Sequence, residues 1–375
     1  MQFYLSDQDH AIRPGHPLWN THLPMTRHSG PSSARQPAPD SLTYGEYFEA
    51  VESFLVDNAD KTVSARIAST EQLEVHLEKH GAFYHPSRIV EPNENRKAQY
   101  VLNVAASTIG KAYLRNEFRI LQMLEKKYAY PFLPRVFACR ETAISESRSV
   151  SLFLGEWFES HHEFHVSKIK QTGSSGIRLW DPANDHCFLS IDEARSAFRQ
   201  AAMILTACYD VETFEQVFAW HHAAGDFVVN LSANREPLVK LVTVRRYAPL
   251  VVAANDDSEA MLDALLLFLF NMSMHMRIDR LDGVGELCWI DDFVVPATLE
   301  GFYKGLALQH LNRRIPEKFA GYFRSYLAKM TAGDMLDLFA SMAARQPPDS
   351  PDTPLVASHA ERHAEAFFNA VRTVD

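Results

Sequence analysis

The chain contains the run Tyr100-Val101-Leu102-Asn103-Val104, followed by a stretch from Leu114 to Leu124 whose apolar residues recur at helical spacing. The first run is rich in β-branched and aromatic residues, which favours a strand. The second repeats apolar residues every three or four positions, which indicates an amphipathic helix. This strand and helix are the centre from which the remaining elements are assigned.

Further strand signals lie on both sides of this centre. Apolar and polar residues alternate over 73–77, and a β-rich run resumes over 88–90 after glycine and proline punctuation. Two more runs follow the helix, at 136–138 and 150–154. Residues 73–156 therefore predict the order strand, strand, strand, helix, strand, strand, with antiparallel pairing through tight turns.

The second half of the chain is predicted to be mainly helical. Ser190 and Glu193 have the spacing of a capping box and open a helix to about residue 209. Two short β-like runs follow at 227–229 and 238–242. Further helices are expected over 258–276, 297–311, 316–331, 334–345 and 357–373.

The predicted fold class is α+β, in four segments. Residues 1–40 are rich in proline without an apolar period, so we expect an extended or disordered arm. Residues 41–155 are expected to form a first domain with a leading helix, an antiparallel sheet and one further helix. A helical domain is expected over 156–345, and a linker with a last helix over 346–375.

Composition excludes several classes of function. The chain of 375 residues carries 37 Lys and Arg against 47 Asp and Glu, a formal net charge of −10. This charge argues against a dedicated nucleic-acid binder and against a polybasic membrane anchor. The longest apolar run, 264–270, is too short to span a bilayer. Four widely spaced cysteines and no secretory signal predict a reduced cytoplasmic protein.

The order of elements resembles the protein-kinase-like fold, including its small-molecule and lipopolysaccharide-sugar kinase branch. Residues 116–122 resemble the N-lobe helix with its glutamate, here Glu117, and residues 154–158 resemble a hinge that includes Glu156. Residues 220–229 lie where a catalytic loop belongs.

This resemblance covers roughly residues 70–310 and implies a two-lobed protein-kinase-like fold. Its N-lobe would be small, with an antiparallel sheet, and its C-lobe mainly helical. A small-molecule ligand would occupy the interlobe cleft near Glu117, Glu156 and Asp226. ATP and Mg²⁺ are the implied cofactors if the protein is active.

Several standard kinase residues are missing from the pattern. Asn103 stands where the resemblance places a phosphate-binding lysine, so Lys111 or Lys97 would have to reach over in its place. No G-x-G-x-x-G loop occurs, and Thr243 or Val244 falls where a second metal-binding aspartate belongs. A hydroxyl or an aliphatic group cannot replace a carboxylate on Mg²⁺, which argues for weak or absent phosphoryl transfer.

The candidate catalytic loop allows two alignments with the family. In one, Asp226 is the catalytic aspartate. In the other, Asp226 is a metal ligand and His221 takes the place of the aspartate. His221 or His222 would assist as a general base. The alternatives are a turn aspartate that caps its own backbone and histidines that are structural.

Other candidate residues have similar pairs of interpretations. Arg245 could bind a phosphate bidentately or be a surface arginine at a strand end. Glu117 could point inward as a charged anchor of the cleft. It could instead lie on a solvated helix face or form an ordinary salt bridge, such as one with Lys111. The dense group at 161–165 favours packing over a metal site, because it lacks HExxH order.

The favoured function is a divergent kinase-like protein, a phosphotransferase on a small-molecule or sugar hydroxyl with degenerate catalytic groups. The alternative is a catalytically inactive pseudokinase that acts as a binding or scaffold module, which leaves room for a protein partner. A third hypothesis is a histidine-dependent hydrolase or metal enzyme built on the Trp220–Asp226 loop.

Overall fold

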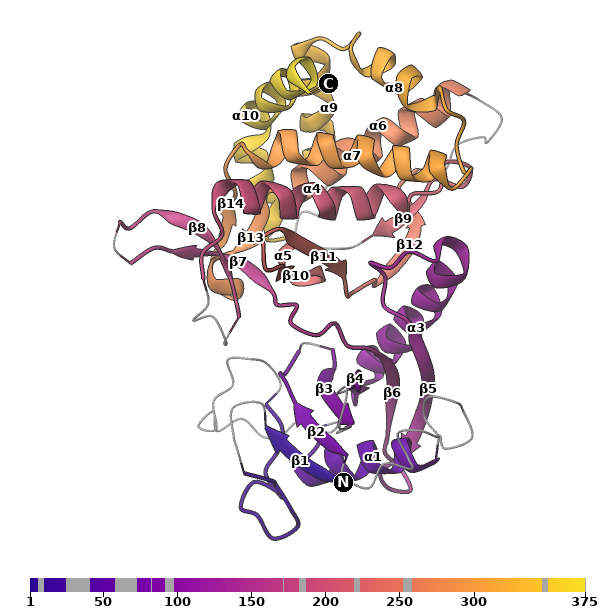
Figure 1. Ribbon diagram of the computed structural model, residues 1–375, viewed down its shortest axis with the longest axis vertical. Helices are drawn as coiled ribbons and strands as arrows, with labels where there is room; N and C mark the ends of the chain where they lie inside the picture. Colours follow the sequence, from indigo (N-terminus) through magenta and orange to yellow (C-terminus); the bar gives the residue numbers. More distant parts are fainter. Residues whose placement is uncertain are drawn as a thin grey trace. The chain divides into compact units, whose positions relative to one another are not determined.

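The structure is a computed structural model. It describes residues 1–5, 10–24, 41–57, 73–81, 83–91, 98–170, 172–181, 187–218, 223–251, 258–345 and 350–374. Its internal contacts divide the chain into two compact units, Met1–Glu159 and Ser160–Asp375 (Figure 1). The first unit is built on one sheet and the second mainly on helices, so the predicted α+β class is confirmed.

The first unit contains a six-stranded sheet in the order β1-β2-β3-β4-β6-β5. Its elements in chain order are β1 (Gln2–Leu5), α1 (Tyr44–Asp57), β2 (Glu74–Leu77), β3 (His85–Glu91), β4 (Ala98–Ala105), α3 (Thr108–Tyr128), β5 (Val136–Ala143) and β6 (Ser149–Glu156). All neighbouring strands pair antiparallel except β1 and β2, which are parallel. The expected antiparallel pairing is therefore correct for β2 to β6, and β1 adds a parallel edge strand that was not predicted.

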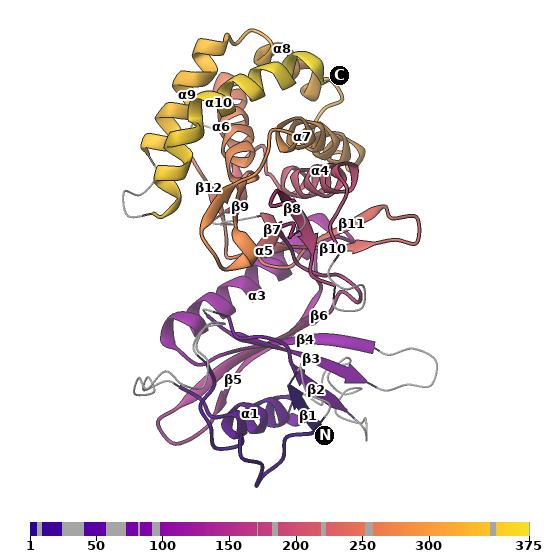
Figure 2. The same cartoon turned by 90° about the vertical axis from the view of Figure 1, so that its left-hand side faces the viewer.

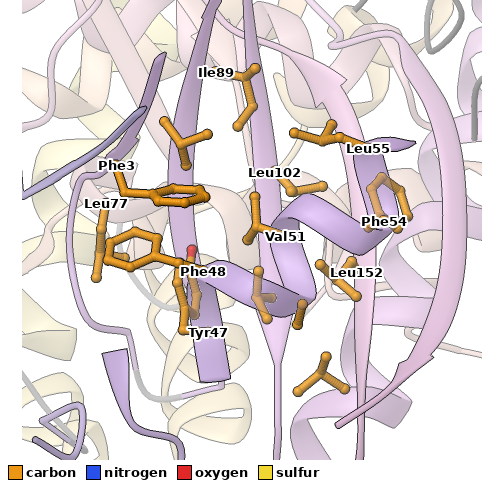
Figure 3. Packing of buried hydrophobic residues seen from close by; sticks show 14 of the residues in the cluster. Phe3, Tyr47, Phe48, Val51, Phe54, Leu55, Leu77, Ile89, Leu102 and Leu152 are labelled. Atoms are coloured by element: carbon orange, nitrogen blue, oxygen red, sulfur yellow. The ribbon is translucent and has the colours of Figure 1, made fainter. Parts of the chain in front are cut away.

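Two helices cover the opposite faces of this sheet (Figure 2). The side chains of Phe48, Val51 and Phe54 on α1 point at alternate residues of the strands, among them Leu102 and Leu152 (Figure 3). The helix α3 packs on β4, β5 and β6. Residues that alternate along one strand therefore face different helices, and Asn103 lies on the face opposite the α1 core.

The first residues of the expected arm form part of the sheet. Phe3 of β1 is buried and its ring stacks on Phe48 at 4.7 Å between centroids. Ile12 and Leu23 are also buried in the same core. Phe3, Tyr4 and Leu5 are consecutive apolar residues without alternation, so the sequence does not predict this strand, and the edge of β2 supplies its pairing.

The helices of the second unit are α4 (Ile191–Ala207), α5 (Ala223–Asp226), α6 (Ser258–His275), α7 (Val294–Leu311), α8 (Phe319–Leu327), α9 (Ala332–Ala344) and α10 (Asp352–Thr373). The capping box at Ser190 and Glu193 is confirmed, with both reciprocal hydrogen bonds present. The expected helices agree to within a few residues, except that α8 is shorter. Along the described residues, no helix has the length and apolar character needed to cross a bilayer.

The helices α4 and α7 pack unusually closely because α7 presents two glycines to α4. A Cβ atom at Gly301 would lie 2.1 Å from the carbonyl oxygen of Arg199, and one at Gly305 would lie 2.4 Å from Thr206 Cβ. Neither distance is compatible with a real side chain. The Gly301 contact is with backbone, which cannot turn away as a flexible side chain can.

Four two-stranded antiparallel sheets complete the described part of the second unit. They pair β7 (Phe164–Lys168) with β8 (Ser175–Leu179), β9 (Glu215–Phe218) with β12 (Arg246–Pro249), β10 (Phe227–Leu231) with β11 (Pro237–Leu241), and β13 (Ile278–Arg280) with β14 (Leu287–Trp289). Only β10 and β11 correspond to strands predicted from the sequence. The β7–β8 hairpin lies in the region 156–345 that was expected to be helical.

Gly301→Ala should destabilise the protein because the added methyl group meets a helix backbone. We expect a loss of about 1–3 kcal/mol in the free energy of unfolding, measured by denaturant titration. Gly321→Ala on α8 is the matched control, because nothing lies within 4 Å of its added Cβ. It should leave stability unchanged or raise it by up to about 1 kcal/mol. Equal effects of the two substitutions would show that α4 and α7 are not in close contact.

Candidate functional site

Asp226 lies at the junction of α5 and β10 and is buried, at 1% exposure. Its Oδ1 atom accepts a hydrogen bond of 2.7 Å from Nη1 of Arg245. The Asp226 side chain is 2% exposed in this ion pair, while that of Arg245 is 26% exposed. Asp226 and Arg245 were both predicted as site residues, and in the structure they form an ion pair with each other.

The backbone brings Arg245 to this position. After β10 pairs with β11, the amide of Val242 donates to the carbonyl oxygen of Asp226 at 2.9 Å. The chain then runs through Thr243 and the fully buried Val244 to Arg245. The segment that the family resemblance assigns to a second metal-binding aspartate therefore places an arginine against the first carboxylate.

The other two candidate catalytic residues, His221 and His222, lie outside the described residues, as does Trp220. Their roles as general base or structural histidines stay predictions. The hypothesis of a histidine-dependent enzyme on this loop likewise stays untested.

In the first unit, Glu117 points inward from α3 and is 3% exposed. The hydroxyl of Tyr84, which precedes β3, donates to Glu117 Oε2. Tyr84 is separated from Glu117 by 33 residues, and no local sequence pattern links them. The alternative of a solvated Glu117 is wrong, and the sequence did not single out Tyr84 as its partner.

Lys111, considered as a replacement for the missing lysine, lies in the first turn of α3. Its Nζ atom donates to Ser149 Oγ at 2.8 Å and to Glu141 Oε1 at 3.4 Å. The Ser149 hydroxyl, Lys111 and Arg115 all lower the pKa of Glu141. The ammonium group of Lys111 therefore binds side chains of the β5–β6 hairpin.

Asn103 and Glu156 occupy different places in the sheet. Asn103 is 9% exposed in the middle of β4, between Pro86 on β3 and Phe153 on β6. Glu156 is the last residue of β6, and its Oε2 atom accepts from the backbone amide of Arg135 at 3.2 Å and from its Nε at 3.3 Å. Glu156 thus holds the chain at the start of β5.

A second polar group in the second unit surrounds His165 on β7. Its Nδ1 atom lies 3.1 Å from Asp279 Oδ1, and the second carboxylate oxygen of Asp279 accepts the amide of Val166 at 2.7 Å. The Nε2 atom lies 3.6 Å from Glu163 Oε2, too long for a hydrogen bond, so we treat Glu163 as a charge partner. His165 and Asp279 are 114 residues apart, so the sequence could not link them.

The surroundings of His165 close it off from solvent. Trp180 covers the ring at 4.8 Å between centroids, and the ring packs so tightly on Gly283 that a Cβ there would lie 2.9 Å from Nε2. Gly283 has φ +71°, which favours glycine. Within the group at 161–165, the ring of His165 is therefore packed inside the second unit. In the described part of the chain, no group of three or more His, Cys, Asp or Glu could hold a metal ion.

Magnesium fits the site at Asp226 poorly. Mg²⁺ is usually held by one or two carboxylates together with phosphate oxygens and water. The Asp226 carboxylate is already paired with the guanidinium of Arg245, and Thr243 and Val244 supply no second carboxylate. The expected role of Asp226 as a magnesium ligand therefore gains no support from its surroundings.

Comparison with known proteins gives little further information. No family model and no curated protein matches the chain. A solved structure described as "WaaP in complex with acyl carrier protein" is similar at a TM-score of 0.29 and 11% sequence identity. That match covers 69% of this chain and 92% of the other. A likeness at this level carries no argument about fold or activity.

His165 should make stability depend on alkaline pH. Burial alone would lower its pKa, but the carboxylates of Asp279 and Glu163 outweigh burial and raise the pKa from 6.5 to about 9. Because the folded state holds this proton more tightly, the stabilisation is complete below pH 6.5 and is lost as pH rises through about 9. The shift corresponds to about 3 kcal/mol.

The measurement is the free energy of unfolding of wild type and His165→Gln between pH 6 and pH 10. We expect the difference between them to shrink as pH rises. His76→Gln on β2 is the control, because the His76 side chain is partly exposed, stacks on the Tyr4 ring and lies 3.3 Å from a carboxylate on its own strand. A difference for His165→Gln that stays constant with pH would contradict a buried imidazolium.

Proposed function

We propose that this chain is a divergent protein-kinase-like protein that binds a phosphate-bearing small molecule and has lost efficient phosphoryl transfer. The proposal rests on the order of elements in the sequence and on the hydrogen bonds and ion pairs that the charged groups form within each unit. It favours the pseudokinase among the hypotheses drawn from the sequence.

The observation that carries the proposal is the ion pair between Asp226 and Arg245. Phosphoryl transfer in kinases depends on carboxylates that hold metal ions against the β- and γ-phosphates. Here the retained carboxylate is buried against a guanidinium at 2.7 Å. A carboxylate in this state attracts a divalent cation less strongly than a free one, since its charge is already neutralised.

The first unit supports the same proposal independently. A kinase uses an ion pair between a strand lysine and the helix glutamate to position phosphates. In this chain the strand residue is Asn103, and the helix residue Glu117 accepts a hydrogen bond from Tyr84. Lys111, the lysine of α3 closest to Glu117 in the sequence, donates hydrogen bonds to Ser149 and Glu141.

An active phosphotransferase on a small-molecule or sugar hydroxyl is the second candidate. The buried carboxylate of Asp226 favours it, because such a group at the start of a strand could accept a hydroxyl proton once Arg245 moves away. ATP and Mg²⁺ would then be required. The experiment below separates the two candidates.

Thermal unfolding should reveal the ligand. ATP or ADP at ten times its dissociation constant should stabilise the folded protein by about 1.4 kcal/mol, because it binds only the folded state. We expect this stabilisation together with no release of the γ-phosphate of ATP above that of a heat-denatured sample. The absence of stabilisation by millimolar ATP and ADP would refute the binding function.

Turnover would instead establish the second candidate. An active phosphotransferase would release γ-phosphate, and Asp226→Asn should abolish that release. Asp282→Asn is the matched control, because Asp282 lies in an exposed turn at φ 52°, which asparagine tolerates. Turnover lost in Asp226→Asn and kept in Asp282→Asn would overturn the pseudokinase proposal.

A further inference from the structure

The side chain of Arg277, which lies between α6 and β13, is 1% exposed. Three contacts hold its guanidinium against the segment that contains β14. Its Nε atom donates to the carbonyl oxygen of Ile290 at 2.8 Å, and its Nη2 atom donates to Asp292 Oδ1 at 2.5 Å. The guanidinium carbon lies 5.0 Å from the centroid of the Trp289 ring. The second unit therefore contains a permanently charged cation inside its packed interior.

His363 connects the last helix, α10, to this cation. Its side chain is buried, and its Nδ1 atom lies 3.3 Å from Nη1 of Arg277. Because a guanidinium can only donate, Nδ1 accepts this hydrogen bond and carries no proton. The proton of the neutral ring is then on Nε2, which donates to Ser273 Oγ on α6 at 3.2 Å. The two hydrogen bonds together require the uncharged form of the imidazole.

The charged groups around His363 disfavour its protonated form. Arg277 is in direct contact with the ring, and Asp292 is shared between Arg277 and Arg362 of α10, which donates to its second oxygen at 3.3 Å. Asp291 acts on Arg277 from the same segment. Burial and the charge of Arg277 outweigh the Asp292 carboxylate and lower the pKa of His363 from 6.5 to about 3. A proton on His363 would place two cations in contact away from water.

The helix α10 is the element that such a proton would displace. It packs on α9, α7 and β14 (Figures 1 and 2). Phe339 of α9 meets the His363 ring edge-on at 4.6 Å between centroids and stacks on Phe270 of α6 at 4.3 Å. Phe367 of α10 lies 4.7 Å from the same Phe270 ring. These apolar contacts favour docking of α10 at every pH, whereas the contacts of His363 favour it only while the imidazole is neutral.

We propose that α10 is an acid-released cover, which protonation of His363 detaches from α9 and β14. Detachment returns the imidazole to water, separates it from Arg277 and uncovers the rings of Phe270 and Phe339. The Asp292 carboxylate stays ionised through this change: burial opposes its charge, but Arg277 and Arg362 outweigh burial and lower its pKa. The inference is independent of the proposed binding function.

The direction of the pH dependence follows from the state that binds the proton more tightly. The imidazole has its ordinary pKa of 6.5 when α10 is detached and a pKa of about 3 when α10 is docked. Docking is therefore fully stabilised above pH 6.5 and weakens as pH falls toward 3. Between these limits the equilibrium constant for opening should rise about tenfold for each pH unit.

The experiment is backbone hydrogen exchange of the full chain between pH 4.5 and pH 7, with each rate corrected for the intrinsic exchange rate at that pH. We expect the protection of α10 amides to fall about tenfold for each pH unit below 6.5. Amides of α4 should stay more strongly protected than those of α10 at every pH, because α10 opens on its own. Equal protection of α10 and α4 across the range would overturn the inference, since α10 would then open only in global unfolding.

Two variants assign the effect to one side chain. His363→Gln keeps an acceptor for Arg277 and a donor for Ser273 but does not titrate, so the pH dependence of α10 protection should disappear. His359→Gln is the matched control, because His359 lies one turn earlier on α10 and stacks on Trp289 at 4.9 Å. It should keep the wild-type dependence.

A tenfold dependence that persists in a folded His363→Gln protein would overturn the inference. Circular dichroism shows whether this variant folds, and the wild-type comparison of α10 with α4 tests the inference without it. Either contrary result would leave the proposed nucleotide binding untouched, because that function is measured separately by thermal unfolding with ATP and ADP.

Discussion

The ion pair between Asp226 and Arg245 is the constraint on which this account of the second unit depends. A buried carboxylate without a partner is costly, so the fold must neutralise Asp226 or protonate it. The chain does so with a residue 19 positions further along. The turn from β10 to β11 and the burial of Val244 bring Arg245 next to Asp226.

The charged groups of the first unit follow the same principle. Three candidates that the kinase resemblance selects have a protein partner: Glu117 has Tyr84, Lys111 has Ser149, and Glu156 has the backbone of Arg135. These contacts stabilise α3 and the ends of β5 and β6. In each of these contacts the polar group binds another part of the first unit.

Much of the fold could be predicted from the sequence, because long periodic segments carry their own signal. The strands β2 to β6, the helix α3 and the capping box at Ser190 were all predicted. The edge strand β1 and the hairpin β7–β8 were missed. In β1, Phe3, Tyr4 and Leu5 follow one another with no polar residue between them, so the sequence shows no alternation.

The site was less accessible to sequence reasoning than the fold. Asp226, Arg245 and Glu117 were singled out, yet their partners depend on contacts across many residues of chain. The pairing of His165 with Asp279 spans 114 positions and has no local signature. Only the three-dimensional arrangement shows that Arg245 meets Asp226, where the sequence suggested a metal or a phosphate for each.

The most direct test of the central claim is a double-mutant cycle on the free energy of unfolding, with Asp226→Asn, Arg245→Gln and the two combined. Removing one partner of a buried ion pair typically costs about 3–5 kcal/mol, because the other charge is left uncompensated. This account requires the double variant to lose clearly less than the sum of the single losses. Additive losses would contradict it, since they would show that the two side chains do not interact in the folded protein.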